Sequence, residues 1–354
     1  MKAIPPKNIL VVRTDRIGDV VLSLPMIPAL TRSFPEAGVY FLLREYTRDL
    51  AGNIPGLRGI LLYDTEKKKK AFLKMLGELR AWEFDTVIVT YPTFRLAVLM
   101  FLSRIPVRVG SGYRWYSVLF NRRVYEHRRT AEKHEAEYNF SLLQTIGCVD
   151  HSSPMPELVI PPAAEREAEI VLKEIGMNGS DRFVVLHPGS GGSARDWDPR
   201  NFAALGTTLR KEGIKVLVTG SAEEEGLVNE VNAAAGGVLT PLAGRLSLLG
   251  LAVVLRRADV FVGNSTGPLH VAAAVGTPVV GMYPPIRECS PRRWGPLTDK
   301  RVIFEPSAFD CPRCRGGACQ GNECMALIRV DDVARAVKGL MQNHRKQKRE
   351  PAAV

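Results

Sequence analysis

Three polar stretches, each placed directly after an apolar run that predicts a β-strand, contain the residues best suited to chemistry. The first is RTDRIGDV, in which Gly18 permits a tight turn and Asp19 begins a helix. A carboxylate at that place could accept a proton from a substrate hydroxyl, and Arg13 and Arg16 could hold an anionic acceptor. The structural alternative is that Asp19 serves only as an N-cap of the helix.

The second stretch, HPGSGGSARDW, combines glycines with a cation. Around Ser190 and Gly191 the backbone is free to approach a phosphate, and Arg195 adds a charge that could neutralise a departing diphosphate. The stretch lacks GKS or GKT and is not GxGxxG, so the pattern supports neither a Walker loop nor a Rossmann dinucleotide fingerprint. The residues therefore predict an anion site of another kind.

A shorter loop, TGSAEEE, follows the next predicted strand. Within it, Ser221 and Glu224 offer hydrogen bonds to a ribose or a base. Acidic residues also stabilise the first turn of a helix, so this structural role is an equal alternative.

The third stretch, GNSTGPLH, links a predicted strand to a helix of small residues. At Thr266 and Gly267 the first N–H groups of that helix have no partner within the helix, which favours an anion. Ser265 can hydrogen-bond a hydroxyl or a phosphate, and His270 lies one turn onward. An ordinary capped loop is the alternative.

The elements that position these stretches alternate between strand and helix along both halves of the chain. One of the helical patterns spans residues 20–31, and four prolines at 154–162 interrupt the alternation before it resumes. Such alternation predicts a parallel, doubly wound α/β sheet in each half. We therefore predict two domains, 1–158 and 159–354, of which the second ends in a helix at about 331–343.

Composition and charge restrict the class of protein. With 45% hydrophobic and 24% charged residues, and with neither a signal-peptide nor a membrane-span pattern at its start, the chain is expected to be a cytosolic globular protein. Part of the net charge of +11 lies between Arg104 and Lys133, where there are eight Lys and Arg against two Glu. Anionic lipid, a phosphorylated saccharide or nucleic acid would each fit that charge, and a merely soluble basic surface is the alternative.

Four of the six cysteines form the pattern C-x2-C-x4-C-x4-C within the loop 311–324. Clustered thiols in a cytosolic chain suggest a metal before disulfides, and four Cys ligands would make a closed, structural zinc site. A cluster without metal is the alternative. The four residues are Cys311, Cys314, Cys319 and Cys324.

Taken together, these stretches resemble a known family of glycosyltransferases. VVRTDRIGDVVLSLP, HPGSGGSARDWD, TGSAEEE and AGRLSLLGLAVVLRRADVFVGNSTGPLHVAAAVGTPVVGMYPP are similar, in order and spacing, to glycosyltransferase family 9, the ADP-heptose:lipopolysaccharide heptosyltransferases. The likeness runs from about Ile9 to Tyr283 and includes the segment HEAEYNFSLLQTIG, which begins at His134. The cysteine cluster is also similar to family sequences, without implying a metal.

The resemblance implies a GT-B fold, in which two Rossmann-like domains face each other across a cleft. It also implies that the final helix, at about 331–343, packs back on the first domain. The first domain would bind the acceptor and the second the nucleotide sugar, and the sugar would be transferred with inversion and with no required metal. Asp19 falls where the family has its catalytic base. Arg195 stands where many members have a Lys that contacts the donor phosphates, and it conserves the charge with a different reach and donor geometry.

Further positions of the family pattern fall on residues already singled out. Glu224 matches the acidic position that helps to hold the nucleoside, and Thr266 and Gly267 match the phosphate-binding TG. Ser265 departs from the pattern, because many members have Asp directly before the TG. A serine can still form hydrogen bonds there but supplies no charge.

The function implied is transfer of a heptose, or a related sugar, from an ADP-sugar donor to a lipopolysaccharide core or a related glycan. The acceptor would be an anionic glycolipid at the inner face of the cytoplasmic membrane, attracted by the basic segment 104–133 and held by Arg13, Arg16, Gly18 and Arg95. One alternative is a family 9 enzyme that uses a different nucleotide sugar. Another is a non-catalytic protein on the same scaffold that binds a nucleotide or nucleic acid, of which nucleic acid is the less favoured partner.

Overall fold

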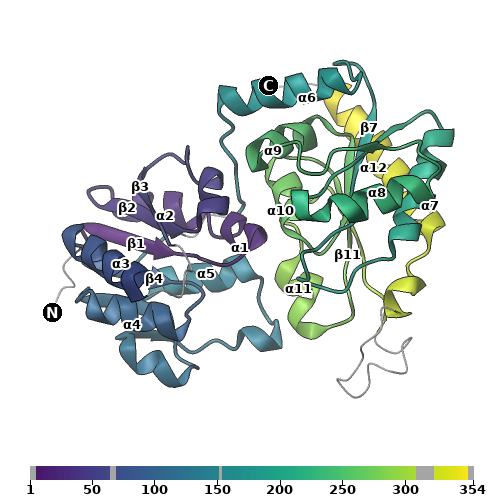
Figure 1. Ribbon diagram of the computed structural model, residues 1–354. Coiled ribbons are helices and arrows are strands. Elements are labelled where there is room, and N and C mark those ends of the chain that lie inside the picture. Colours follow the sequence, from purple (N-terminus) through teal and green to yellow (C-terminus); the bar gives the residue numbers. More distant parts are fainter. Residues whose placement is uncertain (1–4, 64–68, 151–153, 308–322, 350–354) are drawn as a thin grey trace. The chain divides into compact units, whose positions relative to one another are not determined.

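The computed structural model of the 354-residue chain describes residues 5–63, 69–150, 154–307 and 323–349. The chain divides into two compact units, Met1–Val159 and Ile160–Val354. Each unit contains one six-stranded sheet in which all neighbouring strands run parallel (Figure 1). The doubly wound α/β class predicted from the sequence is thereby confirmed.

The sheet of the first unit has the strand order β3-β2-β1-β4-β5-β6, so the chain order reverses between β1 and β4 at its centre. Ligands bind at the carboxyl ends of the strands at such a reversal. The strand β4 is buried along its whole length, and β1 is buried after its first residue, as expected for strands covered on both faces. The elements of this unit are β1 (Asn8–Val12), α1 (Ile17–Val21), α2 (Met26–Ser33), β2 (Gly38–Leu43), η1 (Glu45–Leu50), β3 (Leu57–Leu62), α3 (Lys69–Ala81), β4 (Thr86–Val89), α4 (Phe94–Leu102), β5 (Val107–Ser111), η2 (Trp115–Leu119), β6 (Arg122–Val124), η3 (Arg128–Thr130) and α5 (Glu135–Gln144).

The second unit repeats this topology, with the strand order β12-β11-β10-β7-β8-β9 and the reversal between β10 and β7. Gly263 of β10 lies opposite His187 of β7, so the chain leaves both strands at the same edge of the sheet. The elements are α6 (Pro162–Glu174), β7 (Phe183–His187), α7 (Pro199–Lys211), β8 (Lys215–Val218), η4 (Ala222–Glu224), α8 (Glu225–Ala234), β9 (Thr240–Pro241), α9 (Leu248–Arg257), β10 (Val260–Asn264), α10 (Gly267–Ala274), β11 (Val279–Met282), η5 (Arg287–Cys289), α11 (Pro291–Trp294), β12 (Arg301–Phe304), η7 (Glu323–Leu327) and α12 (Val330–Arg349).

The single helix predicted over residues 20–31 is wrong, because the structure divides it into α1 and α2. Turns occupy residues 22–25, where Pro25 has no N–H to continue the helical ladder of hydrogen bonds. The interruption places Ser23 so that its hydroxyl donates to the carbonyl oxygen of Asp19 at 2.8 Å. The short strands β5, β6, β9 and β12, which lie at or next to the sheet edges, were not predicted.

The last helix, α12, is longer than the predicted segment 331–343. It packs beside α7 and against β10 and β11, as the yellow helix in Figure 1 shows. Its residues Val333, Val337 and Met341 are buried in the core of the second unit. The apolar face of α12 is thus covered within its own unit. Packing of this helix on the first domain stays a prediction. No helix in the described part of the chain, α12 included, is both long enough and apolar enough to span a bilayer.

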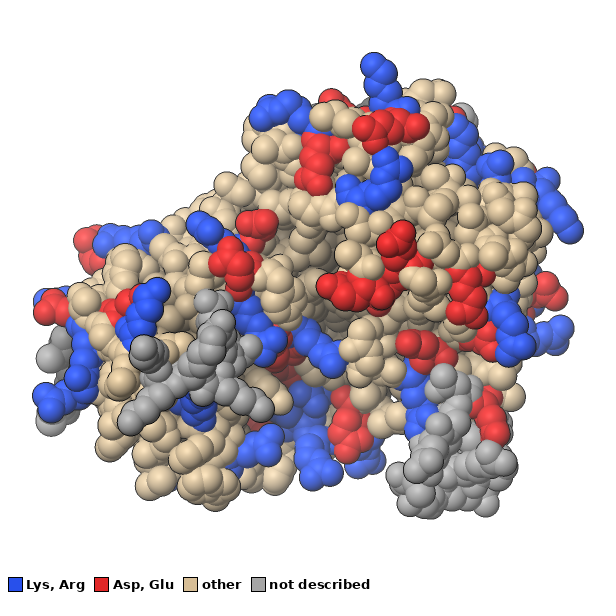
Figure 2. All heavy atoms as spheres, in the orientation of Figure 1, with Lys and Arg blue, Asp and Glu red and all other residues tan. Residues whose placement is uncertain are grey.

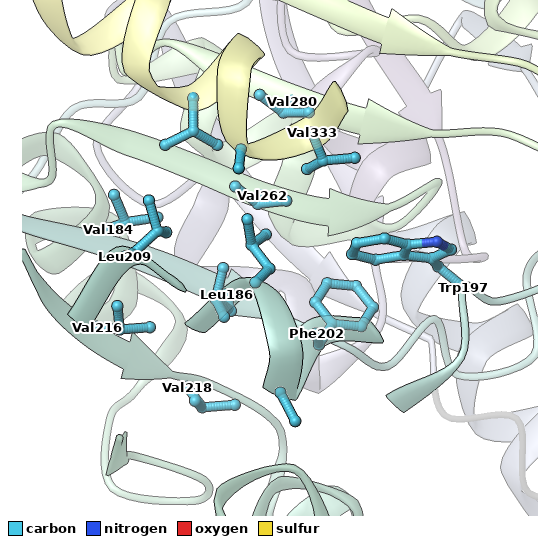
Figure 3. Packing of buried hydrophobic residues seen from close by; sticks show 14 of the residues in the cluster. Val184, Leu186, Trp197, Phe202, Leu209, Val216, Val218, Val262, Val280 and Val333 are labelled. Carbon is cyan, nitrogen blue, oxygen red and sulfur yellow. The ribbon is translucent and has the colours of Figure 1, made fainter. Parts of the chain in front are cut away.

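Trp197 anchors the loop that follows β7 in the core of the second unit. Its side chain is fully buried, and its ring packs edge-on against Phe202 with the ring centroids 5.0 Å apart. The indole N–H donates to the carbonyl oxygen of Ile328 at 2.9 Å. Figure 3 shows the two rings in one cluster with Leu186 and Val333. The position of this loop is therefore set by core packing.

Replacement of Phe202 by alanine should lower the free energy of unfolding of the second unit by about 3 to 5 kcal/mol, because it leaves a cavity beside the indole of Trp197. Arg210→Ala, at an exposed position on the same helix, is the matched control and should leave that free energy unchanged. Urea denaturation followed by Trp emission measures both. Equal stability of the two variants would show that the Phe202 ring does not support the loop.

Candidate active site

Arg13 is the centre of a buried ionic cluster at the carboxyl end of β1. Its side chain is 1% exposed, and its guanidinium donates to Asp15 Oδ1 at 2.7 Å and to Glu135 Oε1 at 3.0 Å. It also pairs with Asp19. A buried cation without partners would be strongly unfavourable, so the three carboxylates are what allow Arg13 to lie here. Burial lowers the pKa of Arg13, but the carboxylates outweigh that effect and raise the pKa above its ordinary value.

Glu135 and Asn139 reach Arg13 from α5, 122 and 126 residues further along the chain. They are four residues apart on the helix and therefore share one face. Asn139 Oδ1 accepts from Arg13 at 3.4 Å, and Asn139 Nδ2 donates to Ser23 Oγ at 3.1 Å. Because Ser23 in turn holds the carbonyl oxygen of Asp19, the network supports both the backbone and the side chain of that aspartate.

The Asp19 side chain is mostly buried, with 14% of it exposed. Burial, opposed by Arg13 and reinforced by the negative charges of Asp15 and Glu135, raises the pKa of Asp19 to about 7. A carboxyl group that titrates near neutral pH is well matched to accept a proton from a substrate. Asp19 is not the N-cap of α1, because Arg16 occupies that position and Asp19 lies in the first turn.

The structure corrects one expectation about this loop. Gly18 was expected to form a tight turn, but it is buried inside α1 and does not have a positive φ. The chain instead bends at Asp15. Arg16 is exposed at the same edge of the sheet, where it is accessible to a ligand.

Arg95 lies at a different place in the first unit. Its guanidinium carbon is 5.7 Å from the centre of the Phe72 ring, and the two side chains, with Tyr63, line a cavity of about 70 Å³. Burial raises the pKa of Tyr63, while Arg95 and Arg44 oppose that rise. The structure therefore places Arg95 and Tyr63 at one cavity, and the charge of Arg44 also acts on Tyr63.

In the second unit, His187 ends β7 and is neutral. Its Nδ1 lies 3.0 Å from Thr219 Oγ1. Complete burial, only partly opposed by Glu224, lowers the pKa of His187 to about 4. Because the imidazole is uncharged at pH 7, the 3.8 Å separation between its Nε2 and Glu224 Oε2 is not an ion pair.

Glu224 has the structural role that its position at a helix start suggested. Its Oε2 accepts from the N–H of Ser221 at 2.9 Å in a capping box. Its side chain also lies against the backbone of Gly189, where a Cβ would be 2.0 Å from Oε1. Glycine at position 189 is therefore what lets Glu224 lie beside the end of β7. The contribution of Ser221 and Glu224 to donor binding stays a prediction.

Asn264 joins two loops of the second unit and was missed by the sequence analysis. It is fully buried at the end of β10, where its Nδ2 donates to the carbonyl oxygen of Pro188 at 2.6 Å. Its Oδ1 accepts from the N–H of Trp197 at 2.9 Å. A second link is the Ser193 hydroxyl, which donates to the carbonyl oxygen of Ser265 at 2.9 Å. The loops after β7 and β10 are thus held together by hydrogen bonds.

The glycine-rich loop after β7 has a conformation that favours glycine. Gly191 and Gly192 have φ values of +56° and +70°, and both are exposed. Ser190 is buried beside Asp196; burial raises the pKa of this aspartate, and the Ser190 hydroxyl opposes the rise. Arg195, next to Asp196, is partly exposed. The loop therefore presents an exposed glycine backbone and a cation together.

The start of α10 has the features expected of an anion site. Thr266 occupies the N-cap and, within the described residues, its hydroxyl makes no capping hydrogen bond. Pro268, with no N–H of its own, is suited to the first turn, and the N–H of Gly267 remains one of the helix's unsatisfied donors. Ser265 is partly exposed just before the helix, and His270 is buried one turn onward. The positive end of the helix dipole adds to the attraction for an anion.

The predicted metal ligands Cys311, Cys314 and Cys319 lie outside the described residues. Cys324 is described and is buried in the core of the second unit next to Met325. In the part of the chain that the structure describes, no three His, Cys, Asp or Glu residues gather as a metal site. The structural zinc therefore stays a prediction.

Sequence reasoning missed four polar residues that the structure places in these clusters. All four lie inside stretches that had been singled out, but the sequence analysis assigned no role to any of them. For Glu135, Asn139 and Asn264 the structure adds burial, which the sequence alone does not state. The four residues are Glu135, Asn139, Asp196 and Asn264.

Comparisons with known proteins agree with this architecture. Residues 72–324 match the family model described as glycosyltransferase family 9 (heptosyltransferase). A Haemophilus influenzae protein, described only provisionally as a glycosyltransferase, is 30% identical over 350 residues, which cover 95% of this chain and 97% of that protein. Lipopolysaccharide heptosyltransferase 3 of Escherichia coli is 25% identical, with 92% of this chain and 96% of that protein covered. The solved structure of E. coli ADP-heptose lipopolysaccharide heptosyltransferase II has a TM-score of 0.77 at 21% identity, covering 96% and 99% of the two chains.

Two Rossmann-like units with the same strand order, and this structural neighbour, define the fold as GT-B. The chain belongs to glycosyltransferase family 9 and is a glycosyltransferase related to the lipopolysaccharide heptosyltransferases. The resemblance inferred from the sequence motifs is confirmed.

Asn264→Ala should lower the free energy of unfolding of the second unit by about 2 to 5 kcal/mol, because it leaves the buried N–H of Trp197 and carbonyl of Pro188 without their partner. Asn229→Ala, an exposed asparagine on α8, serves as the control and should not change stability. Urea denaturation measures the difference. If both variants unfold at the same urea concentration, Asn264 does not hold the two loops.

Proposed function

We propose that this glycosyltransferase moves a heptose, or a related sugar, from an ADP-sugar to a lipopolysaccharide core or a related glycan, with Asp19 as general base. The observation that carries the proposal is a carboxyl group paired with Arg13 at the carboxyl end of a central strand, with its pKa raised to about 7. The names of the E. coli relatives, a lipopolysaccharide heptosyltransferase and an ADP-heptose lipopolysaccharide heptosyltransferase, support this donor and acceptor.

In the proposed reaction, Asp19 takes the proton of an acceptor hydroxyl while the hydroxyl oxygen attacks the anomeric carbon of the sugar. The bond from that carbon to the diphosphate breaks, and the nucleoside diphosphate leaves with the bonding electrons. Attack from the face opposite the leaving group inverts the anomeric centre in one displacement. The proton on Asp19 then passes to solvent, which restores the base.

Arg195 and the N–H groups at the start of α10 stabilise the departing diphosphate in this proposal. The hydrogen bond between Ser193 and Ser265 supports the assignment, because it ties the loop of Arg195 to the segment that leads into Thr266 and Gly267. Removal of one such group typically costs about 3 kcal/mol in the transition state. These groups supply the positive charge, so the proposed displacement requires no metal.

The nucleoside is assigned to the loops after β7 and β8. The exposed backbone at Gly191, next to the buried Ser190, is open to a phosphate of the donor. One oxygen of Glu224 is engaged by the Ser221 N–H, which leaves the other able to accept from a ribose hydroxyl. His270, one turn into α10, completes the proposed donor site.

The acceptor is assigned to the first unit, with Arg16 and Arg95 as the cations that contact its anionic groups. We place the reaction at the inner face of the cytoplasmic membrane, where a glycolipid acceptor would lie. A different nucleotide sugar is the second candidate donor, and Ser265 favours it. This residue supplies no charge at a position where the family pattern has Asp, and its hydroxyl hydrogen-bonds Tyr283.

Asp19→Asn should reduce turnover by about 10² to 10⁴-fold, because the acceptor hydroxyl would lose its proton acceptor. Release of ADP from ADP-heptose with a lipopolysaccharide core acceptor measures this. Asp15→Asn is the matched control, since it also removes a carboxylate partner of Arg13 but not the base, and it should lose far less. Equal activity of wild type and Asp19→Asn would refute the base assignment. Failure of the wild type to release nucleotide from any nucleotide sugar would favour a non-catalytic binding protein.

Turnover at low substrate should rise with pH up to about 7 and then level off, because the raised pKa leaves Asp19 protonated and unable to act as a base in acid. Below that pH the rate should fall about tenfold per unit, as expected for one ionisation. Measurement of kcat/KM from about pH 5.5 to 8 tests this expectation, because the protein is expected to stay folded over that range. The residual activity of Asp19→Asn should lack this rise, and a flat wild-type profile would contradict the assignment.

A further inference from the structure

The helix α4 of the first unit is apolar around most of its circumference. One side, with Leu96, Leu99 and Met100, is buried in the core. The other side presents Phe94 and Phe101, which are two turns apart and 49% and 47% exposed. A helix that is apolar all round is normally buried all round. The outer face of α4 is therefore as apolar as a surface that packs against another part of a protein, although it is exposed.

The short helix η2 extends this exposed face. Trp115 and Val118 are 78% and 69% exposed, and the rings of Phe94 and Trp115 have centroids 4.8 Å apart. Contiguous exposed apolar surface of this kind marks a site for a protein or a membrane. We call it the α4–η2 surface, and it consists of Phe94, Phe101, Leu102, Trp115 and Val118.

The charge that accompanies the α4–η2 surface has one sign. Residues 86–125 contain six Arg and no Lys, Asp or Glu. Arg108 lies over the ring of Phe101 at 5.4 Å and donates to the carbonyl oxygens of Leu119 and Ile105, which holds this cation against the apolar surface. Figure 2 shows largely uncharged surface at the lower left, over α4, with Lys and Arg beside it. Other exposed cations in the adjoining segments are Arg104, Arg114, Arg122 and Arg123.

A bilayer with anionic head groups fits these features better than other partners. Aromatic side chains such as Trp115 favour the boundary between head groups and acyl chains, Val118 and Leu102 suit the apolar side of that boundary, and arginines attract anionic lipid. Nucleic acid would match the arginines but would leave the aliphatic side chains without a role. A protein partner would have to supply acidic groups and an apolar pocket of matching shape. A bilayer with anionic lipid supplies negative charge and an apolar interior over its whole surface, without a pocket of matching shape.

We propose that the α4–η2 surface docks this protein on a bilayer that contains anionic lipid. Thr93, the N-cap of α4, comes shortly after β4, so the Phe94 end of the surface lies at the carboxyl edge of the sheet, which also carries Asp19. Docking brings that edge toward the lipid, where a membrane-anchored acceptor could reach it. This last step rests on the proposed transfer reaction, but the docking itself does not.

Vesicle flotation tests the docking, with phosphatidylcholine vesicles that contain or lack phosphatidylglycerol. Wild type should float with the anionic vesicles. Trp115→Ser combined with Val118→Ser should partition at least about tenfold more weakly, because two apolar side chains no longer enter the lipid. Arg114→Gln should weaken binding about fivefold, as expected for one charge near an anionic surface, and added salt should weaken it further.

Matched controls come from exposed positions of the second unit. Ile170→Ser on α6, where the side chain is 59% exposed, and Arg210→Gln on α7 should float as wild type does. Equal flotation of the Trp115/Val118 variant and Ile170→Ser would overturn the proposal, and so would binding that ignores anionic lipid. A dimer in wild type that the Trp115/Val118 variant loses in vesicle-free buffer would assign the surface to a second copy and would also overturn it.

Two further measurements separate docking from folding and from transfer. Brominated lipid should quench the emission of Trp115, and Trp115→Phe should keep docking but lose most of that quenching, because Trp82, Trp197 and Trp294 do not belong to the α4–η2 surface. Unchanged quenching in Trp115→Phe would place another side chain at the bilayer and contradict the proposal. Asp19→Asn should float as wild type does, so that loss of the transfer reaction and loss of docking are distinguishable.

Discussion

The burial of Arg13 is the constraint on which the first half of the proposed site depends. A guanidinium that is 1% exposed must be matched by negative charge, and its carboxylate partners come from the loop after β1, from α1 and from α5. The same contacts hold Asp19, whose backbone is also held by Ser23. The contacts that balance the charge of Arg13 therefore also fix the position of Asp19. Any change at Glu135 would alter both the pairing of Arg13 and the titration of Asp19.

The second unit uses the same strand order with different electrostatics. Where the first unit buries a cation, the second buries a neutral imidazole, His187, and a neutral amide, Asn264. These groups hold the loops after β7, β8 and β10 through hydrogen bonds. Positive potential for an anion is then left to Arg195 and to the start of α10. In the proposed function, one topology thus supports a proton acceptor in one unit and an anion site in the other.

Much of the fold followed from local patterns, because the central strands are continuous apolar runs bounded by polar loops. The failures have local causes too. Pro25 divides a helical pattern that otherwise looked continuous. The strand β6 begins with two arginines, and β9 has only two residues, so neither has an apolar signal of its own. The sequence of α4 does not say that Phe94 and Phe101 stay exposed, because burial depends on what packs against each side of the helix.

For the site, the sequence by itself determined which loops are candidates for the chemistry and to which family the chain belongs. The motifs that contain Asp19, Arg195 and Thr266 each follow a strand, and the order of those motifs was enough to identify the family. Only the tertiary structure decided that Glu135 pairs with Arg13 from 122 residues away, and that burial raises the pKa of Asp19 to about 7. The physical reason is that pairing and desolvation depend on distance through space and on exclusion of water, and neither is set by neighbours along the chain.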